Sequence, residues 1–302
     1  MDTLLLSFDM IGPVDISGLP VFCSLDTREG SDCFGHWIHE CATFLPKILK
    51  LKTYYPDIKI LLHTKRRFKL NTLIDFGFQE TDIVYSNTMV PASACKCYIW
   101  HGDMCLDRTH NYHGWVMPEI QSLTFIPHYT FSTATGVSNT LFLENVKEFQ
   151  SEYGVTQYTG PKTIPILYLI RSRKENYSMN AREFANLDGF VDMIKRHNVY
   201  ILDIDTLSSL KEQAAIVMRA KIIIHEYGSA TVNSTFFSKN AHTLLLNTFG
   251  QGECLVKLFD HLIKENGTIW ESFKSKYAWD NIVIDLQAFE ARLIELKALY
   301  QL

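Results

Sequence analysis

Apolar residues in the first third of the chain recur at two spacings, one typical of helices and one of strands. Between Phe34 and Leu51 they return every three or four residues, which predicts an amphipathic helix that Pro46 should bend or end early. A short apolar run at Lys59–His63 predicts a buried strand instead. Helix and strand patterns alternate up to residue 100, which indicates an α/β layer with a mostly parallel sheet.

The second half of the chain shows this alternation more clearly. Strands are predicted at Ile164–Ile170, Val199–Leu202, Lys221–His225 and His242–Leu246. Helices are predicted at Asn180–Leu187, Ser208–Arg219 and Ala230–Phe237. Such close alternation builds βαβ units, so this half should form a parallel, Rossmann-like sheet. After Gly252 the pattern is mostly helical, with one strand at Asn281–Asp285 and a closing amphipathic helix at Leu286–Leu299.

One stretch, Lys221–Phe237, joins a strand to a helix through a turn of small residues. Three isoleucines precede Glu226-Tyr227-Gly228-Ser229, where glycine would let a ligand approach the backbone closely. The helix that follows would place free N–H groups and a positive dipole at the carboxyl end of the strand, an arrangement that suits a phosphate. An ordinary strand-to-helix connection has the same local pattern, so both interpretations stay open at this point.

Composition narrows the class of protein. The 302 residues are 47% hydrophobic and 21% charged, which is typical of a globular protein with room for two domains. A net charge of −4 favours neither nucleic acid nor an anionic membrane surface as a partner. The N-terminus lacks a signal-peptide pattern and no segment reaches about 18 consecutive apolar residues, so we expect a cytoplasmic protein without membrane insertion. Neither the seven cysteines nor the histidines of residues 101–128 form a zinc template.

Several segments, taken in order, carry a family resemblance. They are Phe34–Glu40 (FGHWIHE), Tyr168–Arg173 (YLIRSR), Asn180–Phe190, Leu207–Gln213 with Ala220, Tyr227–Asn233 with Phe236, and Trp279–Leu293. Together they resemble the glycosyltransferase 61 family, also described as capsular-polysaccharide glycosyltransferases. The chain departs from the family pattern at Tyr227, where many members carry histidine.

The resemblance implies an α/β protein of GT-B type, with two Rossmann-like lobes, a cleft between them and a C-terminal helical tail. We therefore expect an acceptor-side lobe at residues 1–155, a donor-binding lobe at 156–255 and a tail at 256–302 that packs back on the lobes. The implied reaction is an inverting, metal-independent transfer of xylose, another pentose or an N-acetylhexosamine. The donor would be a nucleoside-diphosphate sugar, for which we expect UDP, and the acceptor a glycan hydroxyl. No cofactor is expected.

The residues that the resemblance assigns to the donor follow two strands of the second half. Arg171 and Arg173 come after Ile164–Ile170, and in an open parallel sheet they would face the same crevice as Gly228. Guanidinium groups there can neutralise a diphosphate through bidentate hydrogen bonds. Glu226 would lie close to the phosphates, where a carboxylate suits a sugar hydroxyl. The full expected donor set is Arg171, Arg173, Gln213, Glu226, Tyr227, Gly228, Ser229 and Asn233.

Transfer to a hydroxyl requires a base for the hydroxyl proton and positive charge for the departing phosphate. His36 and Glu40 are four residues apart, so on a helix they would share one face. We expect Glu40 to act as the general base and His36 to position the acceptor or to orient Glu40. Glu226 is the rival base.

Two alternatives belong to other classes. Asp203-Ile204-Asp205 is a DxD sequence after a strand, and in a metal-dependent transferase of GT-A type it would chelate a divalent cation. The simpler interpretation is that Asp205 or Thr206 caps the helix that follows. The second alternative is a non-catalytic protein that binds a glycan or a nucleotide on the same scaffold.

Overall fold

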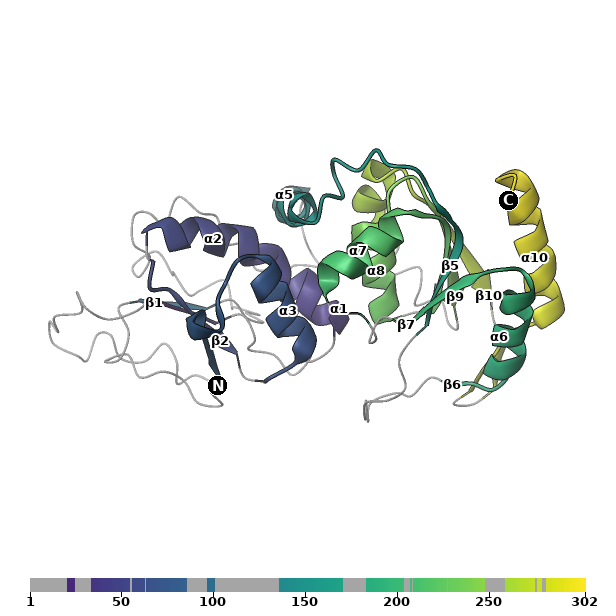
Figure 1. The fold of residues 1–302 in the computed structure, drawn as a ribbon, viewed down its shortest axis with the longest axis horizontal. Coiled ribbons are helices and arrows are strands. Elements are labelled where there is room, and N and C mark those ends of the chain that lie inside the picture. Colours follow the sequence, from purple (N-terminus) through teal and green to yellow (C-terminus); the bar gives the residue numbers. More distant parts are fainter. Residues whose placement is uncertain are drawn as a thin grey trace, which may run out of the picture. The chain divides into compact units, whose positions relative to one another are not determined.

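Each half of the chain builds a parallel β-sheet with helices against it (Figure 1). The computed structural model describes residues 21–24, 34–54, 56–62, 64–85, 97–100, 136–170, 183–203, 207, 209–226, 228–247, 259–274, 276–278 and 281–302. The chain divides into two compact units, residues 1–149 (unit 1) and 150–302 (unit 2), which are described separately. The α/β class expected from the sequence is confirmed.

Unit 1 contains a four-stranded sheet of short strands. The strands are β1 (Val21–Ser24), β2 (Lys59–Leu62), β3 (Ile83–Tyr85) and β4 (Cys97–Trp100). They lie in the order β3-β2-β1-β4, and every neighbouring pair is parallel. The strand predicted after the first helix is confirmed as β2. Helix α3 (Arg67–Asp75) follows β2.

The helix predicted from Phe34 is not one regular α-helix. The chain forms α1 (Phe34–His36), the π-helix η3 (Trp37–Cys41), the 3-10 turn η4 (Ala42–Phe44) and α2 (Leu45–Tyr54). The predicted apolar stripe is nevertheless buried, as Trp37, Phe44 and Ile48 show. Pro46 does not end the helix, because it lies in the first turn of α2, where a missing N–H removes no intrahelical hydrogen bond of α2.

Unit 2 contains a five-stranded parallel sheet. Its strands are β5 (Ile164–Ile170), β7 (Tyr200–Asp203), β8 (Ala220–Glu226), β9 (His242–Asn247) and β10 (Ile269–Lys274). They lie in the order β10-β9-β8-β5-β7. The four strands predicted for this half are confirmed. The apolar runs of β5, β8 and β9 are buried on both faces, as inner strands of a parallel sheet require, whereas the edge strand β7 is only partly buried.

Helices cover both faces of this sheet. They are α6 (Leu187–Arg196) and α10 (Leu286–Leu299) on one face, and α7 (Leu210–Met218) and α8 (Ser229–Phe237) on the other (Figure 1). Helix α5 (Gly136–Glu152) crosses the boundary between the units in sequence. Among the residues that the structure describes, no helix is long and apolar enough to cross a membrane.

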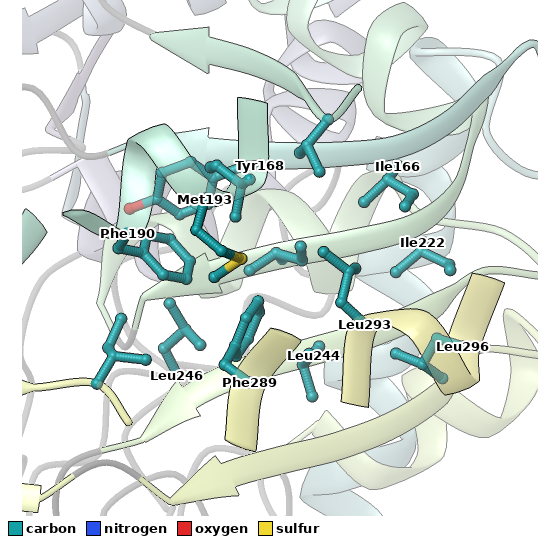
Figure 2. Packing of buried hydrophobic residues seen from close by; sticks show 14 residues of the cluster. Ile166, Tyr168, Phe190, Met193, Ile222, Leu244, Leu246, Phe289, Leu293 and Leu296 are labelled. Carbon is teal, nitrogen blue, oxygen red and sulfur yellow. The ribbon is translucent and has the colours of Figure 1, made fainter. Parts of the chain in front are cut away.

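The largest apolar cluster of unit 2 lies between the sheet and the helices α6 and α10. Figure 2 shows its side chains, which include Tyr168, Phe190, Met193, Ile222, Leu244, Phe289 and Leu293. The rings of Phe190 and Phe289 meet edge to face with their centroids 5.0 Å apart, which joins the two helices. Strand residues alternate between faces, so Ile223 and His225 of β8 are buried on the α7 and α8 side instead.

The prediction that the chain after Gly252 is mostly helical is wrong in part. The closing helix is confirmed as α10, but Ile269–Lys274 forms β10, which pairs with β9 at the edge of the main sheet. A second, three-stranded sheet contains β11 (Lys276–Ala278), β12 (Asn281–Val283) and β6 (Glu183–Phe184), in that order. β6 and the start of α6 also replace the helix predicted at Asn180–Leu187, within its described residues.

Candidate functional site

The order in which strands are added to the unit 2 sheet reverses between β5 and β8, although all the strands remain parallel. From β5 the chain passes to β7 on one side, then returns to β8 on the other side and continues outward to β9 and β10. In open parallel sheets, ligands bind beyond the carboxyl ends of the strands at such a reversal. Most of the expected donor residues end or follow these same two strands in sequence, and Gln213 lies in α7 before β8. Of that set, Arg171, Arg173 and Tyr227 lie outside the described residues.

The turn between β8 and α8 depends on Gly228. Its φ of 135° and ψ of −143° lie in a region that only glycine adopts readily. The Gly228 N–H donates to the Thr231 hydroxyl at 3.2 Å, and the Thr231 N–H donates to the Gly228 carbonyl at 2.9 Å. Helix α8 therefore begins at Ser229, directly beyond the end of β8, with the positive end of its dipole at the carboxyl edge of the sheet.

Glu226 is the last residue of β8 and is held from the α6 side of the sheet. Its side chain lies on the face that carries Tyr168, and the Tyr168 hydroxyl donates to its Oε1 at 2.8 Å. Only 7% of Glu226 is exposed. The structure thus fixes this carboxylate at the carboxyl end of β8, next to the turn that the sequence assigned to the donor.

His225 points to the opposite face of the sheet and is fully buried. Its Nδ1 lies 2.9 Å from the Glu226 carbonyl oxygen and its Nε2 lies 3.0 Å from the Ser234 hydroxyl. Burial lowers the pKa of His225 to about 4, so the ring is neutral near pH 7. Because a carbonyl oxygen can only accept, the single ring proton belongs on Nδ1. The sequence prediction missed this contact, although a histidine that ends an isoleucine run was a visible signal.

Asn233 is completely buried in α8, and within the described residues neither atom of its side-chain amide has a hydrogen-bond partner. It comes four residues after Ser229, so the two positions share a face of the helix. Gln213 is a buried residue of α7, the helix that packs against α8. A buried amide without a partner costs about 1–3 kcal/mol. Such a group in a native fold calls for an explanation, and a bound ligand is one.

The DxD sequence follows a different strand from the turn at Gly228. Asp203 ends β7, an edge strand, while Asp205 and Thr206 lie outside the described residues. The predicted cap is wrong, because Ser209 caps α7 and its hydroxyl accepts from the Glu212 N–H at 3.1 Å. In the part of the chain that the structure describes, no three His, Cys, Asp or Glu residues gather as they would around a metal ion.

The unit 1 sheet also has a reversal, between β1 and β4. The expected catalytic segment lies in the helical stretch after β1. His36 ends α1 half-buried, and its ring centroid is 5.3 Å from that of His39. Glu40 lies in the π-helix, a conformation found frequently at functional sites, and its side chain is outside the described part.

A buried lysine that sequence reasoning missed joins this segment to the helix after β2. Lys69 of α3 is fully buried, with its Nζ 2.7 Å from the Thr64 hydroxyl and 5.7 Å from the centre of the Trp37 ring. The Trp37 indole N–H donates to the Thr72 hydroxyl of the same helix at 3.2 Å. Because Thr64 follows β2, these contacts lie at the carboxyl edge of the sheet.

Fold and site together define an α/β protein with candidate ligand positions beyond the carboxyl ends of parallel strands. The sequence model of the glycosyltransferase 61 family matches residues 34–244, well over half of the chain. The chain therefore belongs to the glycosyltransferase 61 family and is a glycosyltransferase, as its motifs indicated. The match extends from the start of α1 into β9, so it includes β8, the turn and α8. No curated protein matches the chain significantly.

The burial of His225 predicts a pH dependence of stability. Its pKa is about 4 in the folded protein against an ordinary value of 6.5, so unfolding takes up a proton between these two pH values. The free energy of unfolding should therefore be highest above pH 6.5 and lose about 3 kcal/mol from this group as the pH falls to 4. Urea unfolding at several pH values measures the slope.

His225→Asn should lower stability at neutral pH and flatten this slope. His242, whose pKa burial also lowers, contributes to the slope that remains. An unchanged slope in the variant would show that His225 does not titrate in this way.

Proposed function

We propose that the protein is an inverting, metal-independent glycosyltransferase of GT-B type. It transfers a sugar from a nucleoside-diphosphate donor, UDP-linked, to a hydroxyl of a glycan acceptor. The observation that carries the proposal is Asn233, whose buried amide has no hydrogen-bond partner in the described residues and lies in the helix that starts at the β5–β8 reversal. Polar groups of this kind, next to a helix N-terminus, suit the polar parts of a nucleotide sugar.

The diphosphate of the donor would lie at the start of α8. Backbone N–H groups of a first helical turn and the helix dipole favour an anion there, and Gly228 has no Cβ to obstruct its approach. Arg171 and Arg173, which follow β5 in sequence, would add the positive charge that stabilises the departing diphosphate. Ser229 and Tyr227 would complete the contacts to the phosphates.

Glu226 would hold the sugar through its hydroxyl groups. The Tyr168 hydroxyl fixes one carboxylate oxygen, so the carboxylate is already oriented before a ligand arrives. We assign this residue to sugar contact rather than to proton abstraction, because it ends β8 beside the proposed phosphate position and one of its oxygens already accepts the Tyr168 hydroxyl. Gln213 and Asn233 would contact the nucleotide from α7 and α8.

The reaction would be a single displacement at the anomeric carbon. The acceptor hydroxyl oxygen forms the new bond to that carbon, and the bond to the diphosphate oxygen breaks with its electron pair leaving on the nucleoside diphosphate. The hydroxyl proton passes to the carboxylate of Glu40, the general base, and His36 orients Glu40 or the acceptor. Inversion follows because attack and departure occur on opposite sides of the carbon.

A panel of nucleotides and nucleotide sugars tests the proposed function. A ligand that binds only the native state raises its stability, so UDP and one UDP-sugar should raise Tm by several degrees. The shift should be the same in EDTA. A shift that disappears in EDTA would favour the metal-dependent alternative with Asp203 and Asp205, and no shift with any nucleotide would contradict the proposal.

Asn233→Leu separates a ligand-binding role of this residue from a structural one. Leucine has the same number of heavy atoms and the same branching but no polar group. Because the amide has no partner in the described part of the fold, its replacement should leave the free energy of unfolding unchanged or raise it. The affinity for UDP, measured by calorimetry, should nevertheless fall about tenfold or more. A large loss of stability with unchanged affinity would contradict this role.

Glu40→Gln tests the base. The variant should bind UDP like the wild type, but its turnover, measured as UDP release in the presence of acceptor, should fall about a hundredfold or more. Glu80→Gln, an exposed position of the same unit, is the control and should retain turnover. Wild-type turnover in Glu40→Gln would move the base role to another residue, and Glu226→Gln would be tested next.

A further inference from the structure

The end of β8 is held from both faces of the sheet by buried side chains. The Tyr168 hydroxyl hydrogen-bonds to the Glu226 carboxylate on one face, and the His225 ring is within hydrogen-bond distance of the Ser234 hydroxyl on the other. We infer that His225 is a positioning residue for donor binding, which sets the backbone of the turn between β8 and α8. This inference rests on the proposed function, because it gives a role to a residue behind the proposed donor site.

His225 connects the last peptide of β8 to the second turn of α8. Its Nδ1–H donates to the Glu226 carbonyl oxygen, the last carbonyl before the turn, at 2.9 Å. Its Nε2 lies 3.0 Å from the Ser234 hydroxyl, which is also 2.9 Å from the Thr231 carbonyl oxygen. The hydroxyl has one proton for these two acceptors. A continuous chain of polar contacts therefore runs from the start of the turn to the helix beyond it.

The other end of the turn is fixed by Thr231. Its hydroxyl accepts the Gly228 N–H at 3.2 Å. The turn is thus held before Tyr227 by His225 and after it by Thr231. Because the turn between Glu226 and Ser229 is short and its Gly228 N–H is bonded to Thr231, a shift of the Glu226 carbonyl would displace the start of α8.

His225 cannot act on a ligand directly. The residue is fully buried, and the ring packs edge-on against Trp270 with centroids 5.3 Å apart. Both ring nitrogens are already engaged, Nδ1 by the Glu226 carbonyl oxygen and Nε2 by the Ser234 hydroxyl, so neither is available to exchange a proton with a ligand. Its effect on the donor would come through the backbone that it orients, and a displacement of that backbone by a fraction of an ångström is enough to weaken a preorganised anion site.

Two substitutions at His225 separate the effects of its two hydrogen-bonding contacts, that of Nδ1 with Glu226 and that of Nε2 with Ser234. In His225→Asn the amide nitrogen can take the place of Nδ1, so the bond to the Glu226 carbonyl can persist while the contact with Ser234 is lost. In His225→Gln the longer side chain can reach Ser234, but its nitrogen is no longer placed for Glu226. Both variants disturb the same buried position, so a purely structural role predicts similar losses in both.

The test compares the Kd of UDP and the Tm of the wild type and these two variants. We expect Tm to fall in both, the affinity of His225→Asn to fall by no more than about threefold, and that of His225→Gln to fall by about tenfold or more. Equal affinities in the two variants would overturn the inference. A wild type that binds no UDP would instead count against the proposed function.

Ser234→Ala is a milder variant that keeps the test decisive where a His225 substitution prevents folding. It removes the partner of Nε2 and leaves the ring and its bond to Glu226 in place. With the ring less firmly held, the affinity for UDP should fall by about threefold. An affinity equal to that of the wild type would contradict the positioning role.

Discussion

The parallel pairing of β5 with β8 is the constraint on which the rest of unit 2 depends. Its register aligns Tyr168 with Ile224 and Leu169 with His225, so the two strands end side by side. Strands β7 and β9 flank this pair on opposite sides, and the connections that follow β5 and β8 therefore diverge. This single pairing brings the end of β5 and the end of β8, which leads into the turn at Gly228, to neighbouring positions on one edge. The donor site that we propose uses that edge.

The buried polar groups at this edge lower the free energy of unfolding, and apolar packing elsewhere in unit 2 offsets this loss. His225, Glu226 and Asn233 are all buried in a region otherwise rich in isoleucine and phenylalanine. Desolvation of such groups is unfavourable unless each finds partners. The stabilising contribution comes from the buried apolar cluster between the sheet and the helices α6 and α10. Different parts of unit 2 thus provide stability and the proposed binding chemistry. The edge can carry buried polar side chains that would destabilise the fold if they occurred throughout the core.

The strength of the apolar pattern decided what could be predicted from the sequence. The isoleucines of β8 and the stripe of α10 predicted those elements correctly. The π-helix Trp37–Cys41 was missed because its apolar spacing resembles that of an α-helix, and β10 was missed because this edge strand is half-exposed and carries charged residues. Motifs located the region of the candidate site. The partners of His225 and Lys69 come from other elements, and only tertiary packing brings them together.

Amide hydrogen exchange with and without UDP tests most directly whether the nucleotide binds at the end of β8. Exchange reports the local opening of each amide, and a ligand that contacts a turn slows the exchange there. Saturation with UDP should protect the amides of Gly228, Ser229, Ala230 and Thr231 and leave those of α3 in unit 1 unchanged. Binding of UDP that leaves the four turn amides unprotected would contradict the account.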